Sequence, residues 1–122
     1  MELERYFKKI TESLKLLSLN FKEQKAYFPD FVDIPFEILD TFENAFMLLP
    51  QLLESNEIAY DVVPNLLRLH YLIIMELKKP EFEKLNVEKL CNSDEWNSIR
   101  NMSKEILKIM GEPIEKPDPN FL

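Results

Sequence analysis

The sequence has 122 residues, of which 46% are hydrophobic and 30% charged, and its formal net charge is −7. This length predicts one domain, and this balance is typical of a folded globular protein rather than a disordered one. Glycine occurs once, at Gly111, whereas hairpin turns need glycine at positions of positive φ. The composition therefore predicts an all-α fold: a compact bundle of about four to five helices in a single domain over 1–122.

Cysteine content and apolar runs bear on the compartment. Cys91 is the single cysteine, so no intramolecular disulfide can form, and we expect a small buried thiol. The N-terminal residues 1–4 are acidic and lack the charged-then-apolar layout of a signal peptide. The longest apolar run, Leu69 to Met75 around His70, is far shorter than the ~20 residues that span a bilayer. We expect a cytoplasmic protein with no membrane partner.

Two longer helices are predicted in the first half of the chain. Apolar residues at three- and four-residue steps predict a helix over 2–19 with this stripe: Leu3, Tyr6, Phe7, Ile10, Leu14 and Leu17. Its other side is expected to face solvent and carries Arg5, Lys8, Lys9, Glu12 and Lys15, while Leu16 lies outside the stripe. Asp33 can cap the next helix, over 35–49, with Pro35 in its first turn. Pro50 predicts a further short turn through Leu53.

The second half predicts a helix over 64–79, with Asp61 as a candidate cap. This segment is apolar on most sides, which is typical of a central helix. One or two short helices are expected between Phe82 and Leu90, with Asn86 between them. The last helix is predicted over 94–110, capped by Ser93 or Asn92 and ended by Gly111. The tail, 112–122, contains three prolines and is expected to be irregular, extended or mobile.

Charge is distributed unevenly along the chain. The 42 residues from Ala26 to Leu67 contain no Lys or Arg and have a formal charge of −8, whereas the remainder is nearly neutral. The acids of this stretch are Asp30, Asp33, Glu37, Asp40, Glu43, Glu54, Glu57 and Asp61. Such a stretch indicates either a face that binds a basic partner or an acidic solvated face that serves solubility alone.

Spacing within the predicted second helix favours a binding face. Glu37, Asp40, Glu43 and Asn44 recur at three- and four-residue steps, opposite the Phe42/Phe46 side. Like charges at these steps repel, and no interleaved lysine offsets them. Phe36 and Met47 project near the same side and could serve as apolar anchors. The candidate partner-binding residues are Asp30, Asp33, Phe36, Glu37, Asp40, Glu43, Asn44 and Met47.

The sequence predicts no catalytic, metal or cofactor site. His70 is the only histidine, and we expect it to be hydrogen-bonded in the core or at a helix edge rather than to act as a general base. A single glycine excludes a glycine-rich phosphate loop. Asp30, Asp33 and Glu37 do not have EF-hand spacing. Nucleic acid is disfavoured as a partner because its phosphates repel a surface of this charge.

The segment from Tyr27 to Phe46 resembles small helical immunity proteins of bacterial contact-dependent growth inhibition and polymorphic-toxin systems. The similar part, YFPDFVDIP followed by FEILDTFENAF, lies within the first half of the chain. The resemblance implies a cytosolic, acidic, non-enzymatic protein that binds and neutralises a cognate toxin domain. Many such toxins are nucleases with basic clefts, for whose Lys and Arg side chains an acidic helix face can compete.

A different class of function fits the same composition. The chain could be a helical regulatory or scaffold module that binds another protein's helix, and the sequence leaves homo-oligomer formation open. An inhibitor of a basic protein predicts a salt-sensitive contact, whereas a scaffold predicts an apolar one with weak salt dependence. A small hydrolase that uses scattered carboxylates is a distant third alternative.

Overall fold

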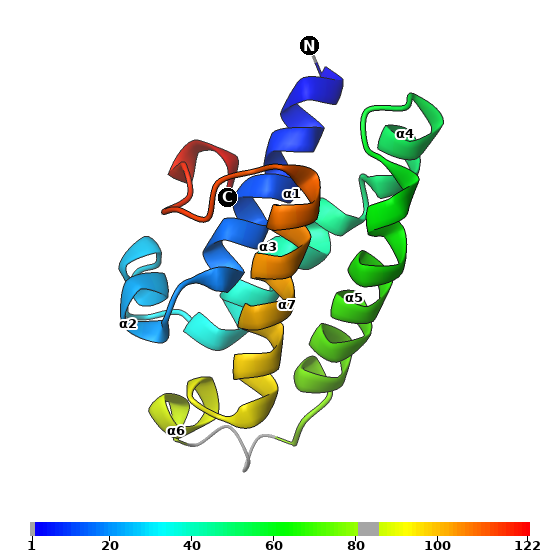
Figure 1. The fold of residues 1–122 in the computed structure, drawn as a ribbon. Helices are drawn as coiled ribbons and strands as arrows, with labels where there is room; N and C mark the ends of the chain where they lie inside the picture. The colour runs from blue at the N-terminus through cyan, green and yellow to red at the C-terminus, as the bar shows by residue number, and fades with distance from the viewer. Residues whose placement is uncertain (1, 81–85) are drawn as a thin grey trace.

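The computed structural model describes residues 2–80 and 86–122, and across them the all-α prediction is confirmed. Four helices of at least thirteen residues form the bundle, with shorter helices and 3₁₀ turns (η) between them (Figure 1). In chain order the elements are α1 (Glu2–Ser18), α2 (Phe21–Gln24), η1 (Lys25–Tyr27), α3 (Ile34–Phe46), α4 (Leu49–Glu54), η2 (Tyr60–Val62), α5 (Val63–Leu77), α6 (Val87–Cys91), α7 (Asp94–Met110) and η4 (Pro119–Phe121). No helix in the described part is both long and apolar enough to cross a membrane.

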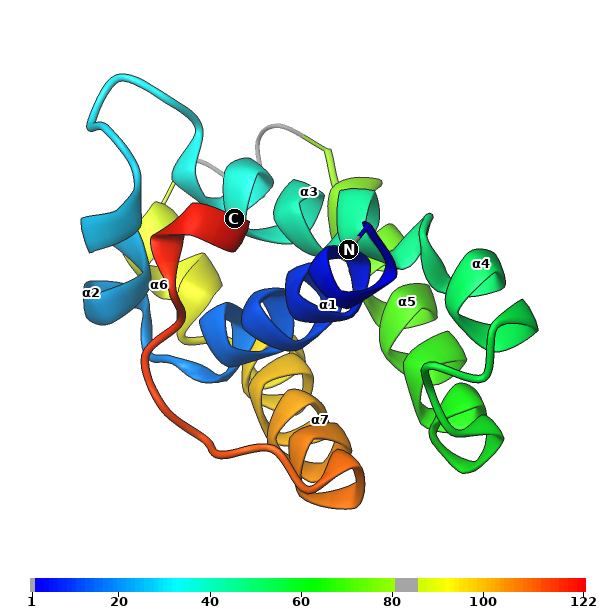
Figure 2. The same cartoon turned by 90° about the horizontal axis from the view of Figure 1, so that it is seen from above.

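The centre of the bundle is α1, which packs against both α3 and α7, while α5 packs against α7 and α3 (Figure 2). Every residue of α1 from Ile10 to Ser18 is buried. The prediction that the helix over 64–79 is central is wrong, because α5 leaves Leu67, Tyr71 and Met75 exposed. Apolar side chains favour burial, but a peripheral helix can bury only the side that neighbouring elements cover.

Two charged residues of α1 are buried, contrary to the expectation that they face solvent. Glu12 and Lys15 are 3% and 5% exposed, and their charged atoms lie 2.8 Å apart. Leu16, which falls outside the apolar stripe, is fully buried. Glu12 and Lys15 tolerate burial because each charged group has a partner of opposite charge. Burial of an unpaired charged group would cost on the order of several kcal/mol of desolvation free energy.

The C-terminal tail supplies further partners for these charges. The backbone N–H of Asp118 donates to Glu12 Oε1 at 2.8 Å, and Lys15 Nζ lies 3.3 Å from Glu115 Oε1. Tyr27 Oη also donates to the carbonyl of Pro117 at 3.2 Å. The tail is irregular as far as η4, but it folds back along α1 rather than extending from the bundle (Figure 2).

Helix caps explain most of the element boundaries. Ser93 accepts from the N–H of Trp96 at 3.3 Å, and Gly111 ends α7 with φ 73°. Asn86 caps α6 by accepting from the N–H of Lys89. The expected cap at Asp61 is wrong, because this residue lies inside η2, which runs directly into α5 without a side-chain cap.

Other boundaries differ from the sequence-based prediction by a turn or less. The helix predicted over 35–49 ends at Phe46, and α4 then starts at Leu49 around Pro50. The sequence analysis missed α2 and η1, which are short. Part of the segment predicted to be helical between Phe82 and Leu90, residues 82–85, lies outside the described residues.

Candidate protein-binding surface

The acidic residues singled out from the sequence lie on α3 and on the loop before it. The carboxylate of Asp33 accepts from the N–H of Phe36 at 3.2 Å, which fixes the start of α3, and Pro35 occupies its first turn. The apolar side of α3 is buried and consists of Ile38, Leu39, Phe42 and Ala45. The remaining side of the helix is therefore left for polar and acidic residues, which face outward.

Half of the candidate residues form one outward strip. Phe36, Asp40, Asn44 and Met47 follow one another at three- and four-residue steps along the exposed side of α3. Met47 is 74% exposed, Phe36 and Asn44 are also exposed, and Asp40 and Glu37 are half-buried. We call this strip, together with the loop acids, the acidic α3 surface: Asp30, Asp33, Phe36, Glu37, Asp40, Asn44 and Met47.

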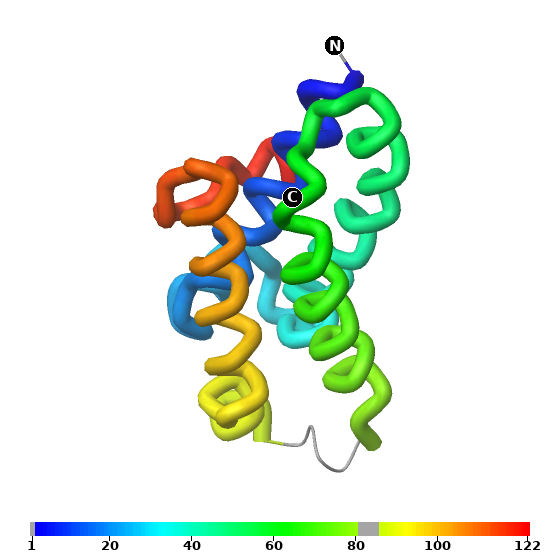
Figure 3. The backbone as a smooth tube through the Cα atoms, turned by 45° about the vertical axis from the view of Figure 1, so that its right-hand side comes forward, coloured from blue at the N-terminus to red at the C-terminus, as the bar shows by residue number. Residues whose placement is uncertain are grey.

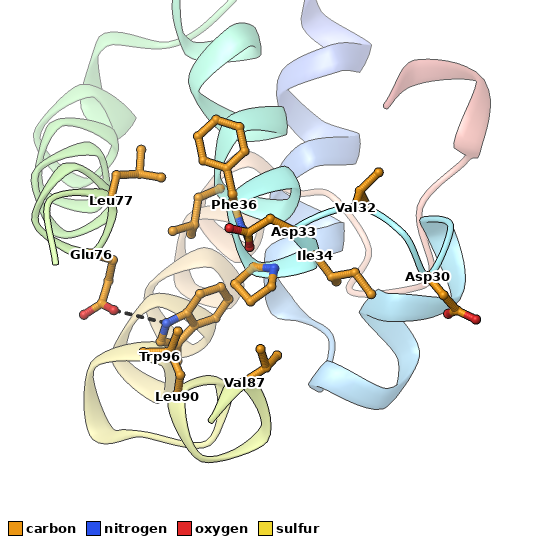
Figure 4. A pocket seen from close by; sticks show the side chains of 12 residues that line it. Asp30, Val32, Asp33, Ile34, Phe36, Glu76, Leu77, Val87, Leu90 and Trp96 are labelled. Atoms are coloured by element: carbon orange, nitrogen blue, oxygen red, sulfur yellow. Dashed lines mark hydrogen bonds between the residues drawn. The ribbon is translucent and has the colours of Figure 1, made fainter. Parts of the chain in front are cut away.

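One end of the acidic α3 surface borders a pocket of about 300 Å³ (Figure 4). Asp30, Asp33 and Phe36 lie at its edge, and Leu39, Leu90 and Trp96 are among its apolar walls. In Figure 4 the side chain of Asp30 points away from the pocket. The carboxylate of Glu76 also lines this space, but it accepts from Trp96 Nε1 at 3.1 Å and pairs with Lys79 Nζ at 2.9 Å. One oxygen of Glu76 therefore ties α5 to α7 through Trp96, and the other is paired with Lys79 just beyond the end of α5.

The other side of the acidic α3 surface borders a second pocket of about 310 Å³, shared with the C-terminal tail. Glu37, Asp40 and Asn44 line it from α3, and Phe121 and Leu122 line it from the tail. Asn44 Nδ2 donates to Asp40 Oδ2 at 3.3 Å, so these two side chains are held against each other. The tail thus contributes apolar atoms beside the acids, a neighbourhood that the sequence pattern did not indicate.

Glu43 does not belong to this outward surface, which corrects its assignment to the partner-binding face. Its Oε1 lies 2.7 Å from His70 Nδ1 on α5, which is the distance of an ion pair. Phe46 stacks on the His70 ring, with centroids 4.2 Å apart. Burial raises the pKa of Glu43, the nearby His70 opposes that rise, and Asp40 adds to it. The pair joins α3 to α5, and His70 lies partly buried at the edge of its helix with the Glu43 carboxylate beside it.

Phe31 is a feature of the surface that the sequence analysis missed. It is 89% exposed in the loop before α3, directly after Asp30. A phenylalanine this exposed gains nothing from the core and presents its ring to solvent. The sequence feature that could have indicated this exposure is an aromatic residue next to an acid in the segment between Pro29 and Pro35. In the structure the part of this segment that precedes α3 consists of turns and not of a helix.

The acids of this region have few cationic neighbours. Within residues 2–80 and 86–122, Glu43 is the one acid of the stretch from Ala26 to Leu67 that forms an ion pair, and its partner is His70. Lys9 lines the second pocket but makes no ion pair there. Among the described residues, the negative charge of the acidic α3 surface is therefore left largely uncompensated.

Groups capable of catalysis are not gathered at this surface. Cys91 is fully buried, and burial raises the pKa of its thiol to about 12, so it is protonated at neutral pH. Within the described ranges, no three His, Cys, Asp or Glu side chains converge as metal ligands would. The arrangement can instead attract cationic groups and offer exposed apolar side chains to a partner.

Neither a protein-family model, nor a curated protein, nor a solved structure matches this chain.

Proposed function

We propose that this protein is a non-enzymatic inhibitor that binds a basic protein partner through the acidic α3 surface. The observation that carries the proposal is the combination of uncompensated carboxylates with exposed apolar side chains on one surface. Asp30, Glu37 and Asp40 supply the charge, and Phe31 and Met47 are 89% and 74% exposed beside them. Charge of this kind accelerates encounter with a cationic partner, and aromatic residues at an interface contribute most of its affinity.

The partner we propose is a bacterial toxin domain, so that the protein acts as an immunity protein. The support is the resemblance of residues 27–46 to immunity proteins of contact-dependent inhibition systems, which covers the loop and helix that carry the acidic α3 surface. A nuclease toxin would present Lys and Arg side chains that normally hold phosphates. The carboxylates of α3 would compete with nucleic acid for these side chains, and the partner's active site would be blocked.

A second candidate function is a regulatory or scaffold module that binds another protein's helix. The observation that favours it is the exposed apolar row on α5, formed by Leu67, Tyr71 and Met75. Binding through that row would depend weakly on salt, whereas binding through the acidic α3 surface would weaken strongly as salt screens the charges.

The experiment that separates these functions is a binding titration against a basic, toxin-like nuclease domain. The double variant Glu37→Lys/Asp40→Lys should bind more slowly and more weakly than the wild type, with an unchanged circular dichroism spectrum. Glu88→Lys/Glu105→Lys is a matched control, because it makes the same change of charge at exposed positions outside the acidic α3 surface. Equal affinity for wild type and both variants would refute the choice of surface.

A further inference from the structure

The outward side of α5 carries a continuous row of exposed apolar side chains. Tyr60 in η2 and Leu67, Tyr71 and Met75 in α5 follow one another at intervals of four and seven residues, with Pro64 exposed between the first two. Tyr60 and Tyr71 are 66% and 61% exposed. We call these five residues the α5 row. In Figure 3, which turns the outer edge of Figure 1 toward the viewer, no described element passes in front of α5.

A row of exposed apolar side chains of this kind is unusual on the solvent-facing side of a helix. Helix geometry places residues at i, i+4, i+7 and i+11 on one side, so the row forms a single strip rather than scattered apolar positions. Tyrosine and methionine are enriched at protein interfaces, where they bury large apolar area at low cost in conformational freedom. Contiguous exposed apolar surface of this kind marks an interaction site.

The two ends of the α5 row have opposite charge. Lys78 is exposed at its C-terminal end, one turn beyond Met75. Glu57 and Asp61 are exposed at its N-terminal end, around Tyr60, and neither forms an ion pair with any of the described residues. The row itself is apolar, Arg68 is exposed beside its middle, acidic residues lie at one end and Lys78 lies at the other.

We propose that the α5 part of this row, Leu67, Tyr71 and Met75, is a homodimer interface, occupied by the same three residues of a second copy in antiparallel orientation. A two-fold axis beside Tyr71 brings the two tyrosines together and sets Leu67 of each copy opposite Met75 of the other. Lys78 lies seven residues from Tyr71, about 10 Å along the helix, and so faces Pro64 of the other copy. From there its side chain reaches Asp61, so that antiparallel pairing matches opposite charges at both ends of the interface.

Parallel or unrelated packing lacks this complementarity. A parallel pair would set Lys78 beside Lys78 and Asp61 beside Asp61, which repel. The α5 row also shares no residue with the acidic α3 surface, so self-association and binding of a basic partner use different parts of the molecule. The dimer is accordingly independent of the inhibitor function proposed above, and its failure would leave that function untouched, whereas the scaffold function would compete with the dimer for the same residues.

Sedimentation equilibrium of the full chain over a concentration series tests the dimer. The expected mass rises toward twice the 14.6 kDa of one chain. Tyr71→Lys should weaken association at least about tenfold, because it places two cations at the two-fold axis. Ile114→Lys, the same kind of change at an exposed apolar residue of the tail, should leave the mass unchanged. Circular dichroism melting of each variant shows whether the fold is retained.

A charge exchange tests the antiparallel arrangement. Lys78→Glu alone and Asp61→Lys alone should each weaken association, since each places like charges at both ends of the interface. The double variant Lys78→Glu/Asp61→Lys restores the opposite pairs and should recover most of the wild-type affinity. A wild-type protein that remains monomeric at all concentrations would overturn the dimer. A dimer whose double variant shows no recovery would overturn the arrangement proposed here.

Discussion

Glu43 of α3 and His70 of α5 lie 2.7 Å apart between Oε1 and Nδ1, partly covered by the ring of Phe46. This contact removes one acid from the outward side of α3 and uses it to hold two helices together. It also explains why the chain's only histidine lies on an otherwise apolar segment. The electrostatic character of α3 is therefore divided: Glu43 serves the fold, and the other acids face solvent.

The Glu43–His70 pair predicts a specific dependence of stability on pH. Burial raises the pKa of Glu43 above its ordinary value of 4.5, so the folded state holds this proton more tightly than the unfolded state. The contribution of Glu43 to stability is then fully present below that value and is lost as pH rises through its higher folded-state pKa. Glu43→Gln has no such proton to lose. The melting temperature of Glu43→Gln minus that of the wild type should increase with pH over this window. A difference that stays constant, or decreases, would contradict the raised pKa.

Phe31 and Phe42 should respond oppositely to the same substitution. Phe42 is fully buried, and Phe42→Ala should lower the free energy of unfolding by about 3–5 kcal/mol through lost burial and the cavity left behind. Phe31→Ala should change it by no more than about 0.5 kcal/mol, because the ring is 89% exposed. Urea unfolding measures both values. Phe31→Ala should nevertheless weaken binding to the basic partner. A loss of stability comparable to that of Phe42→Ala would contradict the prediction, because it would show that the Phe31 ring packs against the core.

The contact between α1 and the tail predicts an unusually costly change at Glu12. Glu12→Ala removes the nearer of the two carboxylates that pair with Lys15 and the acceptor of the Asp118 N–H, which should cost roughly 1–3 kcal/mol. Glu12→Gln keeps the acceptor and the side-chain volume, and should cost less. Glu105→Ala is the control, because its pair with Lys108 is exposed, and such pairs contribute at most about 1 kcal/mol. If Glu12→Ala and Glu105→Ala unfold at the same urea concentration, the buried pair has no structural role.

Local sequence signals predicted the helices that have their own caps. The bounds of α7, Asp94–Met110, follow from Ser93 at its start and Gly111 at its end. The start of α3 follows from Asp33 and Pro35 in the same way. Capping depends on residues within one turn of the helix end, so it can be recognised without knowledge of the fold. The all-α class was predictable for a similar reason, since it rests on composition and apolar spacing.

The properties that depend on distant segments were not predictable. Glu12 and Lys15 are buried because the tail, about a hundred residues away in the sequence, covers them. Glu43 does not lie on the acidic α3 surface, because its carboxylate is paired with His70 of α5. The exposed side of α5 reflects the number of neighbouring helices, not the composition of α5 itself. In each case the decisive partner comes from elsewhere in the chain, and periodicity carries no information about it.

The most direct test of the central claim is the salt dependence of binding to the toxin-like domain, measured for the wild type and for Glu37→Lys/Asp40→Lys. The acidic α3 surface predicts tight, stoichiometric binding at low salt that weakens as salt is added and that silences the partner's activity. It also predicts that the double variant binds weakly at low salt and loses most of the salt dependence. Binding that is indifferent to salt and to both substitutions would contradict the claim that this surface recognises a basic partner.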